Sequence, residues 1–355
     1  MLWLRKICIN LSNETLMANK KRIYIAYTGG TIGMKPSQNG FVPVAGYLSE
    51  TIRNMPEFYH DDMPEFEIHE YEPLIDSADI SPQAWQGLAE DIQQKYQEFD
   101  GFIILHGTDT MSYSASALSF IFESLSKPVI ITGSQIPLSQ LRSDARANLL
   151  NSLYIAAHHP INEVCIFFNN QLFRGNRTTK QHADGFSAFV SPNYPILLEA
   201  GIEIKNIAGK KQKTVNTRLT IGKIEKQSIA ILHLFPGLDW QVLDNLLKSP
   251  LQALVLLTYG VGNAQQDPQL LKTLKEASER DILIVNCSQC LKGSVNMEGY
   301  ATGHALSEVG VISGFDMTTE TVIAKLHYLL SQELSVNVIK ELLITDLRGE
   351  LSTPA

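Results

Sequence analysis

Apolar runs alternate with helix-like stretches along most of the chain. The runs are continuous and rich in Ile, Val and Leu, which is typical of strands buried on both faces of a parallel sheet. One intervening stretch repeats Trp85, Leu88, Ile92 and Tyr96 at helical spacing. This β–α–β order predicts an α/β fold with two doubly wound, parallel-sheet domains. The apolar runs lie at residues 23–27, 101–107, 127–133, 163–168, 228–235, 253–260 and 282–288, and helices are expected at 84–96, 114–125 and 267–280.

A polar, Lys-rich segment with weak patterning separates two series of these elements. It spans residues 203–227 and predicts a linker between a larger N-terminal domain, 18–202, and a smaller C-terminal domain, 228–355. Residues 1–17 precede the first apolar run. We expect them to be an N-terminal extension, either from a start placed upstream of Met17 or as a short ordered arm.

A glycine-rich turn follows the first predicted strand directly, with Gly29, Gly30 and Thr31 in succession. A dinucleotide fingerprint needs glycine at its first and third positions and then a helix. Here Thr31 holds the third position, and residues 33–46 are a loop with prolines and glycines. We therefore expect backbone N–H groups beside the Thr31 hydroxyl at the carboxyl end of a strand, with 33–46 as a lid. An ordinary turn with an exposed threonine is the alternative.

Two further loops carry polar side chains that suit chemistry. Thr108 and Asp109 follow the strand at 101–107, where they fit either a helix N-cap or a site shared with Thr31. Lys180 lies in a basic loop, residues 169–185. That loop is either a solvated surface or a means of bringing the Lys180 ammonium beside an acid and a hydroxyl.

A fourth segment precedes the helix at 84–96. Asp76 and Ser77 could hold the amino and carboxylate groups of an amino acid, whereas Ser81 and Pro82 fit the N-cap and first position of the helix.

Composition narrows the class of partner. Lys and Arg number 29 and Asp and Glu number 37, so the net charge is −8. This balance argues against a nucleic-acid or anionic-membrane partner. Four cysteines are too few for a disulfide framework in a chain of this size. A secretory signal places its positive charges before an apolar run, whereas Arg5-Lys6 follow a short one here. For both reasons we expect a cytoplasmic protein. Cys287 and Cys290 form a C-x-x-C without further ligands nearby, so no metal site is expected.

Three segments occur in the order TGGTI (28–32), HGTDT (106–110) and RGNRTTK (174–180). Together with residues 142–156 and 299–306, they resemble the bacterial-type L-asparaginase family, and specifically its type I, cytoplasmic members. The resemblance runs from about Lys21 to the end of the chain, and the first two segments are highly specific for the family.

The resemblance implies hydrolysis of L-asparagine to L-aspartate and ammonia, without a cofactor, through a β-aspartyl ester on Thr31. It implies that Thr108, Asp109 and Lys180 assist proton transfer, and that backbone N–H groups near Gly30 and Thr108 stabilise the oxyanion. The substrate-binding residues that it implies are Gly30, Asp76, Ser77, Ala78, Thr108 and Asp109.

One position departs from the family pattern in the lid. Phe41 stands where related sequences have a tyrosine that bonds the nucleophilic threonine, and phenylalanine has no hydrogen-bonding group. Tyr27, another group or water would then take that place, or the lid would act by excluding water.

The resemblance also implies a homotetramer, a dimer of dimers, with allosteric asparagine sites between subunits. A charged residue expected near those sites is replaced by Leu257. The matching allosteric positions are Thr179, Asn263, Ser288 and Cys290.

Two other functions are open on the sequence. One is an amino-acid-binding module without catalysis. The other is an amidotransferase subunit acting on aminoacyl-tRNA, for which the basic appendage is missing: the only cationic tract is Lys210, Lys211 and Lys213.

Overall fold

The computed structural model describes residues 20–38, 40–208, 218–248, 250–299 and 301–352. The predicted extension at 1–17 and the cationic tract of Lys210, Lys211 and Lys213 lie outside these residues.

The N-terminal domain is built on one mixed sheet. In the described residues it has eight strands in the order β12-β11-β8-β7-β6-β5-β1-β4. The five strands from β4 to β7 in that order are parallel, and the three beyond them are antiparallel. The strands are β1 (Arg22–Tyr27), β4 (Glu65–Glu70), β5 (Gly101–Leu105), β6 (Val129–Thr132), β7 (Val164–Phe168), β8 (Gln171–Arg174), β11 (Leu198–Ala200) and β12 (Ile204–Asn206).

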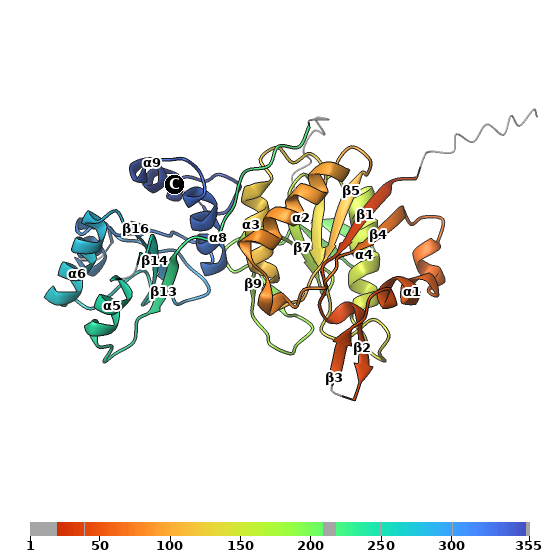
Figure 1. Cartoon of the computed structure of the whole chain (residues 1–355), viewed down its shortest axis with the longest axis horizontal. Helices are drawn as coiled ribbons and strands as arrows, with labels where there is room; N and C mark the ends of the chain where they lie inside the picture. Colours follow the sequence, from red (N-terminus) through yellow and green to blue (C-terminus); the bar gives the residue numbers. More distant parts are fainter. Residues whose placement is uncertain (1–19, 39, 209–217, 249, 300, 353–355) are drawn as a thin grey trace, which may run out of the picture.

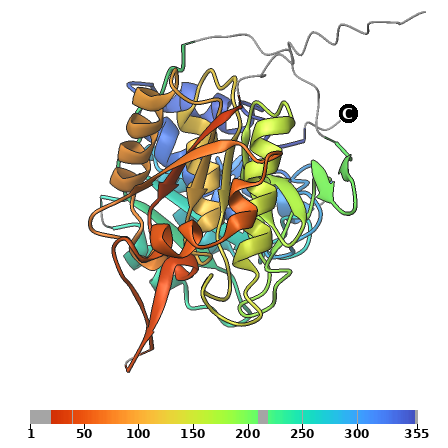
Figure 2. The same cartoon turned by 90° about the vertical axis from the view of Figure 1, so that its right-hand side faces the viewer.

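Helices cover both faces of this sheet, as the continuous apolar runs predict. Helices α2 (Pro82–Lys95) and α3 (Met111–Ile121) pack on one face, and α1 (Tyr47–Arg53) and α4 (Ala145–His158) on the other. In Figure 2 the orange α2 and the yellow-green α4 stand on opposite sides of the strands. The expectation of a doubly wound α/β domain is confirmed.

The antiparallel edge is a difference from the predicted all-parallel sheet. Asn169 and Asn170 join β7 to β8 with φ of 47° and 63°. Two consecutive residues with positive φ form the two-residue turn that reverses a strand, and asparagine tolerates this conformation. The chain therefore turns back along the sheet instead of crossing over through a helix.

The C-terminal domain is smaller and contains a parallel sheet in the order β13-β14-β15-β16. Helices α5 and α6 pack on one face, whereas α8 covers the other and also packs against α3 of the N-terminal domain. Figure 1 shows the two domains side by side with α8 and α3 between them. The elements are β13 (Ile229–His233), α5 (Trp240–Leu246), β14 (Ala253–Thr258), α6 (Pro268–Glu279), β15 (Leu283–Ser288), α7 (Ala301–Glu308), β16 (Ile312–Ser313), α8 (Thr319–Leu330) and α9 (Val336–Leu343).

The segment between the domains, predicted as a linker at 203–227, packs against the N-terminal domain and, at its end, against α8: the Glu225 and Gln227 backbone N–H groups donate to Ser331 and His327. It begins with strand β12, and Ile221 later bridges to Phe122 at the end of α3. This bridge gives Phe122 an extended ψ of 99°, which ends the helix earlier than the predicted 125. The domain boundaries themselves stay predictions.

The predicted lid contains a β-hairpin of β2 (Met34–Ser37) and β3 (Gly40–Pro43). It projects from the body of the N-terminal domain at the bottom of Figure 1. Phe41 on β3 is 47% exposed.

Two glycine turns touch at the carboxyl edge of the large sheet. A Cβ atom placed on Gly30 would lie 2.4 Å from the backbone nitrogen of Gly107, and one placed on Gly29 would lie 2.2 Å from the carbonyl oxygen of Ile75. Side chains at these glycines would therefore push apart the loops that follow β1, β4 and β5. The loops converge because the sequence leaves out those side chains.

We expect Gly30→Ala to lower the free energy of unfolding by more than about 2 kcal/mol, since it combines a strained φ of 88° with a backbone clash. Gly237 is the matched control: its φ is also 88°, but no heavy atom of the described residues lies within 4 Å of its Cβ position. Gly237→Ala should therefore show only the strain of the backbone. Urea denaturation measures both. Equal losses in the two variants would mean that the contact with Gly107 contributes nothing.

Candidate functional site

The candidate site lies where the loops after β1, β4 and β5 meet. The Thr28 backbone N–H and hydroxyl both donate to the carbonyl oxygen of Leu105, at 3.0 and 2.9 Å. The Ile75 N–H donates to the Thr28 carbonyl oxygen at 2.7 Å, which attaches the third loop. These bonds and the glycine contacts fix the edge of the sheet where ligands bind in open α/β folds.

Thr31 and Thr108 are the next residues of the two touching glycine turns. Thr31 begins a short 3₁₀ helix, Thr31–Gly33, and its side chain is half-buried. Gly30 and Gly107 precede these threonines and are in backbone contact. The first two predicted motifs therefore converge at one place.

Lys180 joins Thr108 and Asp109 in one cluster. Its Nζ donates to Thr108 Oγ1 at 2.8 Å and to Asp109 Oδ1 at 2.7 Å. Lys180 belongs to strand β9 (Thr179–Lys180), which pairs with β10 (Phe189–Val190). The structure thus brings together three side chains that lie on two separate loops of the sequence.

Helix α3 begins after Thr110, so the N-cap alternative for Thr108 and Asp109 is wrong. The Thr110 hydroxyl donates to the carbonyl oxygen of Ser77 at 2.6 Å, which ties the start of α3 to the fourth predicted segment. Asp109 is then free to face Lys180.

The segment with Asp76 and Ser77 lies against the same turns. The Asp76 carboxylate accepts the backbone N–H of Ala78 at 2.9 Å and so caps the short helix η3 (Ser77–Asp79). Ser77 is buried, and a Cβ on Gly107 would lie 2.4 Å from its hydroxyl oxygen. The structure therefore places Asp76 and Ser77 beside the loop that carries Thr108.

Gln135 is a residue of this cluster that the sequence analysis missed. Thr108 Oγ1 donates to Gln135 Oε1 at 3.2 Å, and Gln135 Nε2 donates to the carbonyl oxygen of Gly185 at 3.0 Å. Gln135 thus joins the Thr108 loop to the loop that follows Lys180. The available signal was its position, since it follows the carboxyl end of strand β6.

The buried His106 side chain bonds the backbone of the loop that carries Thr108. Its Nδ1 lies 2.7 Å from the Gly107 carbonyl oxygen, which only accepts, so Nδ1 carries the hydrogen. Its Nε2 then accepts from the Ser114 hydroxyl at 2.8 Å, and that oxygen accepts the Trp85 indole N–H at 2.8 Å. Burial lowers the pKa of His106, although the bond to Gly107 opposes that effect.

Tyr27 is a further hydroxyl at the glycine turn. A Cβ on Gly33 would lie 2.2 Å from its oxygen, which is buried and has no hydrogen-bond partner among the described residues. Burial raises the pKa of Tyr27 well above its ordinary value. The Tyr27 hydroxyl therefore lies beside Gly33 but makes no hydrogen bond to Thr31 in the described structure, and Phe41 is exposed on the hairpin.

Three of the four predicted allosteric positions share a small cavity. Thr179, Ser288 and Cys290 line it, together with Leu257, and its volume is about 120 Å³. Thr179 Oγ1 donates to Glu320 Oε1 at 2.6 Å in the same cavity. Asn263 does not line it; its side-chain oxygen accepts from Thr302 at 2.6 Å.

Neither a metal cluster nor a membrane span is found in the described part of the chain. Among those residues no group of three or more His, Cys, Asp or Glu side chains could hold a metal ion. None of the helices that the structure describes combines the length and apolar composition needed to cross a bilayer.

We expect the His106 imidazole to stay neutral at about pH 6, where an ordinary histidine is mostly protonated. The unfolded chain takes up this proton below about pH 6.5 and the folded chain does not, so His106 lowers the free energy of unfolding as the pH falls past that value. Long-range ¹H–¹⁵N NMR of the imidazole nitrogens follows the titration directly. Protonation of His106 at about pH 6.5 would contradict the neutral assignment.

Both domains match families of known proteins. Residues 22–212 match the family "Asparaginase, N-terminal", and residues 228–343 match the "Glutaminase/Asparaginase C-terminal domain". L-asparaginase 1 of Escherichia coli (strain K12) is 56% identical over 333 residues, which cover 94% of this chain and 98% of that protein.

Two further relatives place the chain within a wider group. The crystal structure of L-asparaginase I from Vibrio cholerae is 57% identical, with a TM-score of 0.90 over 94% of this chain and 100% of that one. A glutamyl-tRNA(Gln) amidotransferase component of Sulfolobus acidocaldarius is 31% identical over 93% of this chain and 75% of that protein. With both domain families matched in order and the same fold present at high identity, this chain belongs to the asparaginase family.

Proposed function

We propose that this protein is an L-asparaginase, which hydrolyses L-asparagine to L-aspartate and ammonia. The observation that carries the proposal is the cluster of Lys180, Thr108 and Asp109 beside the contact between Gly30 and Gly107. Acyl transfer needs a hydroxyl nucleophile, a group that moves its proton and fixed donors for the oxyanion. The meeting loops offer candidates for all three.

In the proposed reaction, the Thr31 hydroxyl oxygen attacks the side-chain amide carbon of asparagine. The bond from that carbon to nitrogen breaks, ammonia leaves with the hydroxyl proton, and a β-aspartyl ester forms. Water then attacks the ester carbon, the bond to the Thr31 oxygen breaks, and Thr31 regains a proton. The products are aspartate, ammonia and free enzyme.

The proposed roles of the other residues follow from their positions. Lys180, held by Thr108 and Asp109, assists the proton transfers. Backbone N–H groups near Gly30 and Thr108 bind the oxyanion, and the buried Ser77 with Asp76 holds the amino-acid head group together with Ala78. Fixed donors of this kind act strongly because they need no reorganisation during the reaction.

The alternatives have less support. The glutamyl-tRNA(Gln) amidotransferase relative is 31% identical to this chain, whereas L-asparaginase 1 is 56% identical to it. A non-catalytic amino-acid-binding module would use the same loops to hold asparagine but would leave the cluster around Lys180 without a task.

A cytoplasmic location, a homotetramer and allosteric control by asparagine are proposals from the resemblance. The cavity lined by Thr179, Ser288 and Cys290 supports a second asparagine site of small size. Leu257 in its wall supplies no charge to hold a carboxylate, so regulation there would differ from that in relatives with a charged residue.

We expect Thr31→Ala to lower kcat for asparagine about 10³-fold or more, because no other group would form the ester. Ammonia release measures turnover, and calorimetric titration with asparagine measures binding. Thr273→Ala on α6, whose hydroxyl bonds Asp244 on α5 within the C-terminal domain, is the control and should keep wild-type turnover. Near-normal turnover in Thr31→Ala would exclude Thr31 as the nucleophile, and binding without product in the wild type would favour the binding module.

Lys180→Met keeps the aliphatic stem but removes the ammonium group from Thr108 and Asp109. We expect kcat to fall about 10²- to 10³-fold, the usual range for loss of a proton-transfer group. Lys205→Met, on strand β12 at the edge of the large sheet, should leave kcat unchanged. Turnover of Lys180→Met within about threefold of the wild type would remove Lys180 from the mechanism.

A further inference from the structure

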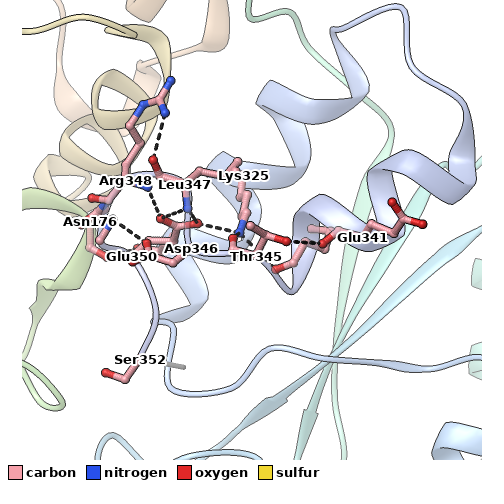
Figure 3. Close-up of polar contacts among 12 residues, drawn as sticks. Asn176, Lys325, Glu341, Thr345, Asp346, Leu347, Arg348, Glu350 and Ser352 are labelled. Carbon is pink, nitrogen blue, oxygen red and sulfur yellow. Dashed lines mark hydrogen bonds and ion pairs between the residues drawn. The ribbon is translucent and has the colours of Figure 1, made fainter. Parts of the chain in front are cut away.

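A buried ion pair attaches the C-terminal end of the described chain to α8. Lys325 on α8 and Glu350 are both fully buried, and Lys325 Nζ lies 2.6 Å from Glu350 Oε1 (Figure 3). Glu350 also accepts the backbone N–H groups of Leu347, at 3.0 Å, and Arg348, at 2.6 Å. The chain after α9 therefore wraps around one carboxylate, and residues 347–352 form what we call the C-terminal latch.

The ion pair is satisfied on both sides. Lys325 Nζ donates further to the carbonyl oxygens of Leu343 and Thr345, at 3.1 and 2.7 Å. Burial opposes ionisation of Glu350, but Lys325 and the two backbone N–H groups hold its pKa below the usual range. Such full bonding is what keeps a buried charge pair stable in one geometry.

The C-terminal latch contacts the turn that leads to Lys180. Three successive latch carbonyl oxygens accept hydrogen bonds from three side chains of the RGNR sequence at 174–177. This one-to-one match fixes the register between two segments that lie more than 170 residues apart. The pairs are Asn176 Nδ2 to Arg348 at 3.0 Å, Arg174 to Gly349 at 3.3 Å and Arg177 to Glu350 at 2.6 Å.

Arg177 extends the contact into the C-terminal domain. It is 2% exposed, and its guanidinium makes two bonds to the Asp316 carboxylate, at 2.7 and 3.1 Å. It donates as well to the Ser352 hydroxyl at 2.9 Å, while the Ser352 N–H donates to Asp316 at 2.8 Å. A fork of this kind orients the Arg177 side chain and the backbone that carries it.

Only two residues separate Arg177 from Lys180. The backbone between them turns from η4 (Gly175–Arg177) into β9, and the Thr178 hydroxyl donates to the Arg174 carbonyl oxygen at 2.7 Å. Any displacement of the 174–177 turn therefore moves Lys180 relative to Thr108 and Asp109, which belong to a different loop.

We propose that the C-terminal latch positions Lys180 for the reaction, with Glu350 and Arg177 as positioning residues. The inference rests on the proposed role of Lys180 in proton transfer. Neither residue touches the cluster of Thr108, Asp109 and Lys180; both act through the turn at 174–177. A small misplacement of a proton-transfer group lowers turnover strongly and leaves substrate binding largely intact.

Glu350→Gln tests the proposal on the full-length protein. We expect kcat for asparagine to fall about 10-fold or more, with KM changed less than about twofold, because Asp76 and Ser77 lie on another loop. Hydrogen exchange of residues 174–181 should quicken, while strand β5 should stay as in the wild type. The matched control is Glu279→Gln, which breaks an exposed pair with Lys275 and should change neither quantity.

Gly349→Ala is a second variant that leaves every charge in place. A Cβ there would lie 2.3 Å from an Arg174 guanidinium nitrogen, so the methyl group would displace the side chain that bonds Gly349. We expect a fall in kcat of about 3- to 10-fold, again without a matching change in KM. Gly237→Ala, also at positive φ but with open space among the described residues, controls for backbone strain. If Glu350→Gln does not fold, Gly349→Ala decides the question.

The outcomes separate this proposal from the proposed function. If Lys180→Met loses activity but the folded latch variants keep kcat within about twofold of the wild type, the latch does not position Lys180. Faster exchange throughout the protein, including β5, with kcat reduced only by the unfolded fraction, would also overturn the proposal. If Lys180→Met itself keeps activity, the proposed role of Lys180 in proton transfer is wrong, independently of the latch.

Discussion

The backbone contact between Gly30 and Gly107 is the constraint on which the rest of the site depends. Two parallel strands end side by side, but ordinary residues after them would hold their loops apart by the size of a Cβ atom. Glycine removes that atom from both loops, and the threonines that follow can then face a common space. The glycines cost conformational stability but let the two loops approach each other closely, as is usual where a protein binds a small ligand.

The two domains contribute to the site in different ways. The large sheet supplies Thr31, Thr108 and Asp109 on loops that its own strands fix. Lys180 comes from outside that sheet, on the two-residue strand β9, which pairs only with β10 among the described residues. The C-terminal domain compensates: α8 shares a core with α3, and the C-terminal latch bonds the turn before Lys180. Packing across the interface thus replaces the support that a longer strand would give.

Much of this arrangement could be predicted from the sequence, because burial on both faces gives strands a continuous apolar pattern. The convergence of the TGGTI and HGTDT loops followed from their position at strand ends. The start of α3 could not be predicted, since Thr110 bonds Ser77 instead of its own helix. The bonds of Gln135 and of the C-terminal latch could not be predicted either, because they join segments that lie far apart in the sequence and share no sequence pattern.

The separation between the two partners of the latch also orders events in time. During synthesis, the turn at 174–177 leaves the ribosome long before Arg348, Gly349 and Glu350 exist to accept its hydrogen bonds. The large sheet can form from residues already made, but the turn before Lys180 gains its final partners only from the last part of the chain. In a growing chain, the glycine turns and the threonines after them can therefore be in place before the turn that leads to Lys180 has its final hydrogen bonds.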